Sequence, residues 1–310
     1  MNKTRLVHFL TTDNLLLPGL LYEPEKKTDK VIIYLHGNGS SSVFYKPEMN
    51  EFAETYNKHD YAFFPFNNRG AHYIKSIKKV VEGREGEKVL YGMTYELIEE
   101  CMADIDGAIS FLQSLGYTTF ILVGHSSGAN KAVVYNYRKP NNKISRFVLE
   151  AGGDDSGLHF GHMGKDRFLN ALASSQKYIS LGKGRKLAPK HLVGDIPISY
   201  QSLFDTINPD GLYNTFPYYS FLYKTPANPH PIPHTKELFI EVNALKTPTL
   251  VVYGFEDEYC YGRVEECVNI FRKNVKDNSH FSYSIIQGAD HGFTNKEGEL
   301  ANTIVNWFAS

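Results

Sequence analysis

The stretch Phe120-Ile121-Leu122-Val123-Gly124-His125-Ser126-Ser127-Gly128-Ala129-Asn130-Lys131 decides the fold of this chain of 310 residues. Four apolar residues predict a buried strand and the residues after Gly128 predict a helix, so Ser126 lies at the tip of a sharp turn. Glycine at 124 and 128 avoids a clash with the neighbouring strand and helix. The G-x-S-x-G pattern alone is a weak signal, but between a strand and a helix it predicts that Ser126 is a nucleophile rather than part of a structural Gly-Ser turn.

The composition limits the classes of protein to consider. With 42% hydrophobic residues the chain can bury a large core, as one domain with an insertion or as a large and a small domain. The net charge of −1 gives no electrostatic reason to expect nucleic acid or an anionic membrane as a partner. Three cysteines without C-x-x-C spacing favour a reducing compartment, and the first twenty residues resemble neither a signal peptide nor a membrane span. We therefore expect a soluble, cytoplasmic protein; its oligomeric state is not predicted.

Strands and helices are expected to alternate at both ends of the chain. A hairpin is predicted at the start, and the later strands are continuously apolar, as in strands buried on both faces of a parallel sheet. Helices between them predict an α/β fold with a mostly parallel central sheet and helices on both faces. The expected strands cover 7–11, 15–22, 30–35, 61–66, 120–123, 147–150, 249–253 and 282–286, and the expected helices cover 44–58, 94–115, 129–138, 263–273 and a final segment from 296.

Residues 155–238 interrupt this alternation. They are too apolar for a disordered linker, so we expect a lid inserted into a core made of residues 1–154 and 239–310. Near its start the lid has a basic stretch, which is either a solvated surface or an attraction for an anionic substrate. This stretch comprises Lys165, Arg167, Lys177, Lys183, Arg185, Lys186 and Lys190. An aromatic stretch from Tyr200 to Tyr223 follows and either packs the lid or lines an apolar pocket. Prolines then cluster between 226 and 233.

A serine nucleophile needs a base, and the base needs a carboxylate to orient it. His291 directly follows the last strand, at the sheet edge where Ser126 also lies, and is the predicted base. Asp257 follows the strand 250–253 at the same edge and is the predicted acid, although Glu256 and Glu258 flank it in a loop that could simply be solvated. The alternative acids, Asp154 and Asp155, follow the preceding strand of the sheet.

Acyl transfer also requires hydrogen-bond donors for the developing oxyanion. The backbone N–H of Ser127, directly after the nucleophile, is one candidate. The second is the N–H of Asn38, in the turn His36-Gly37-Asn38-Gly39-Ser40, whose glycines let the backbone approach a substrate carbonyl.

These motifs occur in an order that resembles the α/β-hydrolase superfamily over nearly the whole chain. The matching pieces are His36–Gly39, the Asn68-Arg69-Gly70 turn, Gly124–Gly128, Gly254–Asp257 and Asp290-His291-Gly292. The Asn67-Asn68-Arg69-Gly70 turn departs mildly from the commoner Asp-x-Arg-Gly. A shorter similarity, over 104–149, links the chain to a poorly characterised fungal and bacterial branch compared with siderophore esterases, through its Gly-His-Ser-x-Gly-x-Asn-Lys run. The chain order Ser126, Asp257, His291 is also the order of this superfamily.

The resemblance implies a serine hydrolase that cleaves a carboxylic ester of a small molecule through an acyl-enzyme and needs no cofactor. The same machinery could cleave amides or small peptides, and the fold could instead carry a non-catalytic ligand-binding protein. Other candidate groups have plainer interpretations. His36 and His125 are expected to pack and orient the site, Cys260 to be a structural thiol, and His159 with His162 lacks a third metal ligand.

Overall fold

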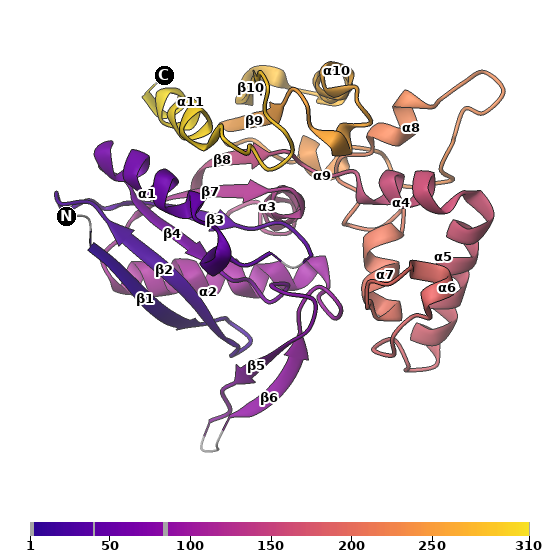
Figure 1. The fold of residues 1–310 in the computed structure, drawn as a ribbon, viewed down its shortest axis with the longest axis horizontal. Helices are drawn as coiled ribbons and strands as arrows, with labels where there is room; N and C mark the ends of the chain where they lie inside the picture. The colour runs from indigo at the N-terminus through magenta and orange to yellow at the C-terminus, as the bar shows by residue number, and fades with distance from the viewer. Residues whose placement is uncertain (1–2, 40, 83–85, 310) are drawn as a thin grey trace.

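The computed structural model describes residues 3–39, 41–82 and 86–309. Within these residues the central sheet has eight strands, in the order β1-β2-β4-β3-β7-β8-β9-β10 (Figure 1). The pairs β1–β2 and β2–β4 are antiparallel, and the pairs among the other six strands are parallel. The predicted mixed α/β fold with a mostly parallel sheet is therefore confirmed. The strands are β1 (Lys3–Leu10), β2 (Leu16–Glu23), β3 (Lys30–Leu35), β4 (Ala62–Phe66), β7 (Thr119–His125), β8 (Ile144–Glu150), β9 (Thr249–Gly254) and β10 (Phe281–Ile286).

Helices cover both faces of the sheet. Helices α1 (Glu48–Lys58) and α11 (Glu297–Ala309) pack on each other, and so do α2 (Cys101–Ser114) and α3 (Ser127–Arg138), on the opposite side of the strands (Figure 1). Because both faces are covered, residues 31–35 of β3 and 120–125 of β7 are all buried, as their continuous apolar sequence predicts. Helix α10 (Val264–Asn274) lies between β9 and β10 in the chain. The main hydrophobic core thus comes from the two ends of the chain.

The predicted helix over 94–115 begins too early. Helix α2 starts only at Cys101, after a single 3₁₀ turn at Ile98–Glu100. Thr94 is fixed by tertiary contacts instead, since its N–H donates to the Tyr73 carbonyl (3.1 Å) and its hydroxyl to the Pro197 carbonyl (2.7 Å). An apolar stripe with helical spacing cannot reveal such contacts, which override the local helical preference.

Two further local differences concern the predicted elements. The structure contains a separate two-stranded hairpin, β5 (Lys75–Lys79) and β6 (Glu87–Tyr91), that the sequence pattern did not predict. Its strands are short and lysine-rich, so they carry little hydrophobic alternation. The helix expected over 44–58 is divided into a 3₁₀ turn at Val43–Tyr45 and α1, with Pro47 at the N-cap of α1.

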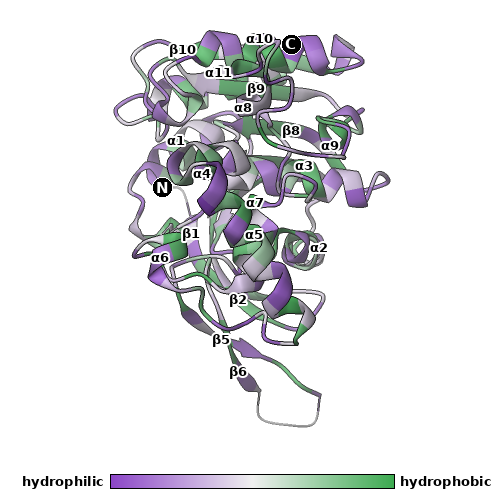
Figure 2. Ribbon diagram, turned by 90° about the vertical axis from the view of Figure 1, so that its right-hand side faces the viewer, coloured by the Kyte–Doolittle hydropathy of each residue, from purple (hydrophilic) through white to green (hydrophobic). Residues whose placement is uncertain are grey.

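The segment between β8 and β9 is helical and has a hydrophobic cluster of its own. Its helices are α4 (Asp155–Met163), α5 (Lys165–Ser180), α6 (Lys190–Val193), α7 (Tyr200–Ile207) and α8 (Tyr218–Leu222), followed by α9 (Ile240–Asn243). Helices α4 to α7 extend to one side of the sheet in Figure 1 and face the viewer in Figure 2, where they carry both hydrophobic and hydrophilic residues. Phe160, Phe168 and Leu203 belong to the cluster that joins α4, α5 and α7. The division into a core and a lid at residues 155 and 238 stays a prediction.

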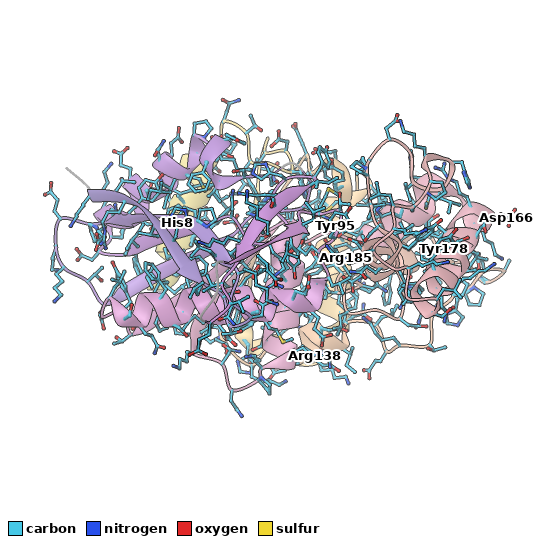
Figure 3. The ribbon with its side chains drawn as sticks, turned by 90° about the horizontal axis from the view of Figure 1, so that it is seen from below. His8, Tyr95, Arg138, Asp166, Tyr178 and Arg185 are labelled. Atoms are coloured by element: carbon cyan, nitrogen blue, oxygen red, sulfur yellow. The ribbon has the colours of Figure 1, made fainter. Side chains whose placement is uncertain are left out.

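One residue of the basic stretch connects the inserted segment to the rest of the chain. The guanidinium of Arg185 lies 4.6 Å from the centre of the Tyr95 ring, and the two side chains are neighbours in Figure 3. Arg185 Nη2 also donates to the carbonyl of Leu90, at 2.6 Å. In the part of the chain that the structure describes, no helix combines the length and the apolar character needed to cross a membrane.

Candidate active site

Ser126 has an unusual backbone conformation at the junction of β7 and α3. Its φ of 56° and ψ of −126° lie outside the regions that side-chain-bearing residues normally adopt. Two hydrogen bonds hold it there: the Ser126 N–H donates to the Glu150 carbonyl, and the Ala129 N–H donates to the Ser126 carbonyl, both at 2.8 Å. Strain of this kind costs about 1–3 kcal/mol and concentrates at functional sites.

The glycines around Ser126 are required by close backbone approaches. A Cβ on Gly124 would lie 2.2 Å from the Gly128 carbonyl oxygen, and a Cβ on Gly128 would lie 2.2 Å from the Leu35 carbonyl oxygen. A Cβ on Gly37 would lie 2.9 Å from the Ser126 Cβ. The turn after β3 is therefore packed directly against Ser126, as its position in the chain predicts.

His291 and Asp257 are in contact. Asp257 follows β9 and His291 follows β10, so the two loops meet at the same edge of the sheet. His291 Nδ1 lies 3.0 Å from both carboxylate oxygens of Asp257, and the Asp257 side chain is only 1% exposed. A carboxylate on Nδ1 fixes the ring so that Nε2 is the nitrogen available to a reactant. Ser126 and His291 line the same cavity, so the structure brings all three predicted residues to one place.

Three further side chains contact His291 or its backbone, namely Glu258, Tyr259 and His125. The sequence analysis did not predict a role for Glu258 or Tyr259 in positioning this histidine. The His291 N–H donates to Glu258 Oε2 at 3.1 Å, and the Tyr259 ring packs edge-on against the imidazole with 4.5 Å between ring centres. His125 Nε2 lies 2.8 Å from the His291 carbonyl oxygen. Burial lowers the pKa of His125 to about 3, so its ring is neutral and donates this hydrogen bond.

The two alternative acids have different surroundings. Asp154 is the N-cap of α4 and accepts hydrogen bonds from the Gly157 N–H (2.9 Å), the Tyr219 N–H (2.6 Å) and the Tyr261 hydroxyl (3.0 Å). Asp154 therefore stabilises the packing of α4 and α8. Asp155 lines the same cavity as Ser126, but Nδ1 of His291 is bonded to Asp257.

The two candidate oxyanion donors, Ser127 and Asn38, have different surroundings. Ser127 is the first residue of α3, so the helix itself does not use its N–H. Asn38 lines the cavity, and its side-chain amide donates to the Tyr213 hydroxyl at 3.2 Å. The Asn38 carbonyl accepts from the Ser41 hydroxyl at 3.1 Å, which orders the turn. Ser40, which the predicted turn includes, lies outside the described residues.

The cavity is mainly apolar. Its volume is about 350 Å³, and of the described residues that line it none is a lysine or an arginine. From the stretch 200–223, which was considered as a pocket wall, Leu203 and Thr206 line the cavity, but none of its aromatic side chains does. Several of these aromatic residues pack inside the protein instead, since Tyr213, Phe216 and Tyr218 are buried. The apolar lining comprises Met93, Leu158, Met163, Val193, Ile196, Ile198 and Leu203.

A buried polar network supports the floor of the site. The His36 imidazole is fully buried, its Nδ1 lies 2.7 Å from the Gly37 carbonyl oxygen, and its Nε2 accepts the Asn68 N–H at 3.2 Å. Lys131 on α3 is also buried and forms an ion pair with Glu96 at 2.7 Å.

The cysteine and the histidine pair that the sequence analysis considered gain no catalytic or metal-binding role from the structure. Cys260 is buried among apolar residues. Among the residues with described positions, no group of three or more histidine, cysteine or acidic side chains could hold a metal ion.

Comparison with known protein families assigns the chain to one family. The family model described as "protein of unknown function (DUF1749)" matches residues 91–308, which is more than half of the chain. The chain belongs to this family. No curated protein sequence matches it. The family description names no activity, so the DUF1749 match by itself adds no chemistry to the site.

Solved structures show the fold of this DUF1749 member. Est1E of Butyrivibrio proteoclasticus with ferulic acid bound is similar over 97% of both chains, with 13% identity and a TM-score of 0.60. An esterase of Pyrococcus furiosus is similar over 99% of this chain and 91% of its own, with 17% identity and a TM-score of 0.58. An Agrobacterium tumefaciens protein classed provisionally as an α/β hydrolase is similar over 98% and 95%, with 15% identity and a TM-score of 0.51. The chain has the α/β-hydrolase fold.

Proposed function

We propose that this protein is a serine hydrolase that cleaves a carboxylic ester of a small molecule through an acyl-enzyme. The observation that carries the proposal is the bond of His291 Nδ1 to the buried Asp257, because His291 lines the same cavity as the strained Ser126. The names of the Pyrococcus furiosus esterase and of the thioesterase domain from the curacin biosynthetic pathway, which has 15% identity and a TM-score of 0.50, agree with this reaction class.

The chemistry follows from the arrangement. Ser126 Oγ attacks the ester carbonyl while His291 Nε2 takes the serine proton, and Asp257 stabilises the imidazolium that forms. The backbone N–H groups of Ser127 and Asn38 stabilise the oxyanion. His291 then gives the proton to the leaving alcohol, and water hydrolyses the acyl-enzyme in a second cycle of the same steps. Loss of one oxyanion donor costs on the order of a hundredfold or more in turnover in comparable sites.

The inserted segment of residues 155–238 acts as a lid in this proposal. Helix α4, its first helix, contributes Asp155, Leu158, His159 and Met163 to the cavity wall. A wall made by an inserted helical segment places an apolar surface over the reacting ester and restricts the access of water. The expected partner is a small ester, without nucleic acid or membrane.

Fluorophosphonate labelling of the wild type and of Ser126→Ala tests the proposal. We expect one adduct, mapped to Ser126 by mass spectrometry, that is absent from Ser126→Ala and retained in Ser180→Ala, a change at an exposed serine of α5. A panel of esters and aminoacyl amides then separates esterase from amidase activity. An unlabelled wild type that binds ligands tightly without turnover would contradict the proposal and favour the non-catalytic binding protein.

A further inference from the structure

The neighbouring carboxylates of Asp154 and Asp155 differ in the hydrogen bonds that they accept from the protein. Asp154 accepts three hydrogen bonds from protein groups, as described above. Asp155 Oδ2, in contrast, is buried and has no hydrogen-bond partner among the described residues. A buried carboxylate oxygen without a partner is expensive, because its desolvation is not compensated. The second acid therefore has an acceptor position that the protein leaves unused.

This unused acceptor belongs to the cavity of the proposed active site. Asp155 is the first residue of α4 and lines the cavity together with Ser126 and His291. His159 lies one helical turn further along α4 and also lines the cavity, on the same face of the helix. Burial lowers the pKa of His159 to about 4, so its ring is neutral and supplies no counter-charge to Asp155.

The position of Asp155 is fixed by the loop that precedes it. Asn130 of α3 forms two hydrogen bonds with Gly153: its Nδ2 donates to the Gly153 carbonyl (2.8 Å), and its Oδ1 accepts the Gly153 N–H (3.2 Å). A Cβ on Gly153 would lie 3.1 Å from Asp155 Oδ2, so the backbone of Gly153 packs against that oxygen. The backbone just before Asp155 is therefore tied to the nucleophile helix α3, and it packs against the Asp155 carboxylate.

The charges around Asp155 leave it negative. Burial raises its pKa to about 6, and the nearby His291 and Lys131 oppose this shift, so the carboxylate is mostly ionised at neutral pH. Lys131 already forms an ion pair with Glu96 and donates to Asn68 Oδ1 at 3.3 Å. The described cavity wall has no lysine or arginine that could offset the repulsion between Asp155 and an anionic group.

We propose that Asp155 determines substrate specificity by accepting a hydrogen bond from a donor group, an ammonium or a hydroxyl, on the ester bound beside Ser126. This inference rests on the proposed serine hydrolase function. The apolar lining holds the hydrocarbon part of the substrate, and the donor group occupies the acceptor position that the protein leaves open at Asp155 Oδ2. Asn38 Oδ1, a neutral amide oxygen of the same cavity, is also buried without a partner among the described residues, but unlike Asp155 it carries no charge. A substrate without a donor leaves the carboxylate desolvated and unpaired, and the enzyme discriminates against it for that reason.

Matched aryl esters test this assignment. We would use nitrophenyl benzoates that carry a methyl, hydroxymethyl or aminomethyl group at the meta or para position, which differ in the donor but little in shape. The variant is Asp155→Asn. The control is Asp166→Asn, the same change at an exposed acid of α5 that lies at the outer edge of the molecule in Figure 3. Selectivity is the ratio of kcat/KM for a donor ester to that for the methyl ester. For an ester that is turned over too slowly to measure kcat/KM, we would instead measure how strongly the ester inhibits the fluorophosphonate labelling of Ser126, and compare the inhibition constants.

We expect the wild type and Asp166→Asn to prefer a donor ester at one ring position by about tenfold or more, as for hydrogen bonds to a charged group. Asp155→Asn should reduce this ratio toward one while Ser126 still labels. A larger preference for the aminomethyl ester identifies a cationic substrate, and an equal preference for hydroxymethyl identifies a neutral one. A wild-type ratio near one, or a ratio unchanged in Asp155→Asn, would overturn the role of Asp155. Absent labelling of Ser126 would instead overturn the hydrolase proposal.

Discussion

His125 Nε2 and the carbonyl oxygen of His291 are 2.8 Å apart, so the residue before the proposed nucleophile holds the loop of the proposed base. Because His125 is the last residue of β7 and Ser126 follows it directly, any shift of the turn is transmitted to the base. This single hydrogen bond links the end of β7 to a loop residue that is 166 positions away in the chain.

His125→Phe should lower kcat and leave KM nearly unchanged. Phenylalanine keeps the ring that packs 5.1 Å from the His291 ring, measured between ring centres, but it cannot donate to the His291 carbonyl. A slightly misplaced base costs about tenfold or more in rate, because proton transfer requires close alignment. Steady-state kinetics on a model ester check this, with thermal unfolding as the control for folding. A rise in KM alone would contradict a positioning role for His125.

Asp257→Asn should reduce kcat/KM at least a hundredfold on the same ester while Asp155→Asn leaves the methyl-substituted ester far less affected. Asparagine on His291 Nδ1 removes the charge that stabilises the imidazolium and permits the wrong tautomer. Measured rates for the two variants side by side identify the acid. Near-full activity in Asp257→Asn together with a large loss in Asp155→Asn would exchange the two roles.

Gly128→Ala should prevent folding or destabilise the protein by several kcal/mol. The added Cβ would lie 2.2 Å from the Leu35 carbonyl oxygen, and neither β3 nor α3 can move without breaking the sheet or the turn. Gly298→Ala in α11 is the matched control, because its Cβ meets nothing within 4 Å. Alanine there should stabilise the helix by up to about 1 kcal/mol. Urea unfolding followed by circular dichroism measures both, and equal stabilities would contradict the close approach.

Glu150→Gln should stabilise the protein near pH 8 and have little effect near pH 4. Both carboxylate oxygens of Glu150 are buried without a partner among the described residues, and burial raises its pKa to about 8. Between the unfolded pKa of about 4.3 and the folded value, the unfolded state releases this proton and the native state keeps it. Native stability therefore falls as pH rises, by at most about 1.4 kcal/mol per pH unit from this group.

Urea unfolding of the wild type and Glu150→Gln at several pH values between 4 and 8 tests this linkage. The difference in unfolding free energy should grow with pH in favour of the glutamine variant. The Ser126 N–H donates to the backbone carbonyl of residue 150, so the substitution leaves that bond in place. A difference that does not vary with pH would show that Glu150 is paired or ionised in the native state.

The sequence predicted most of the sheet because its signals are local. The strand over 30–35 was predicted with the limits that the structure has, and the turn at Ser126 follows from two glycines whose close approaches the structure confirms. One prediction, a helix from Thr94, was wrong because of contacts with Tyr73 and Pro197 that no local pattern contains. Helical spacing of apolar residues shows which face a segment would bury as a helix. It does not show which other parts of the chain pack against that segment.

By itself the sequence determined the α/β class, the strained serine turn and the three loops from which the candidate site is built. The succession of strands along the chain and the residues of the turns can be recognised from short stretches of consecutive residues. Only the tertiary structure decided that Asp257 and not Asp154 or Asp155 contacts His291, and that Glu258 and Tyr259 also contact that histidine. It also decided which of two adjacent aspartates is satisfied by the protein and which has an open acceptor in the cavity. Side-chain hydrogen bonding and burial depend on neighbours brought from distant parts of the chain, and these exist only once the fold is complete.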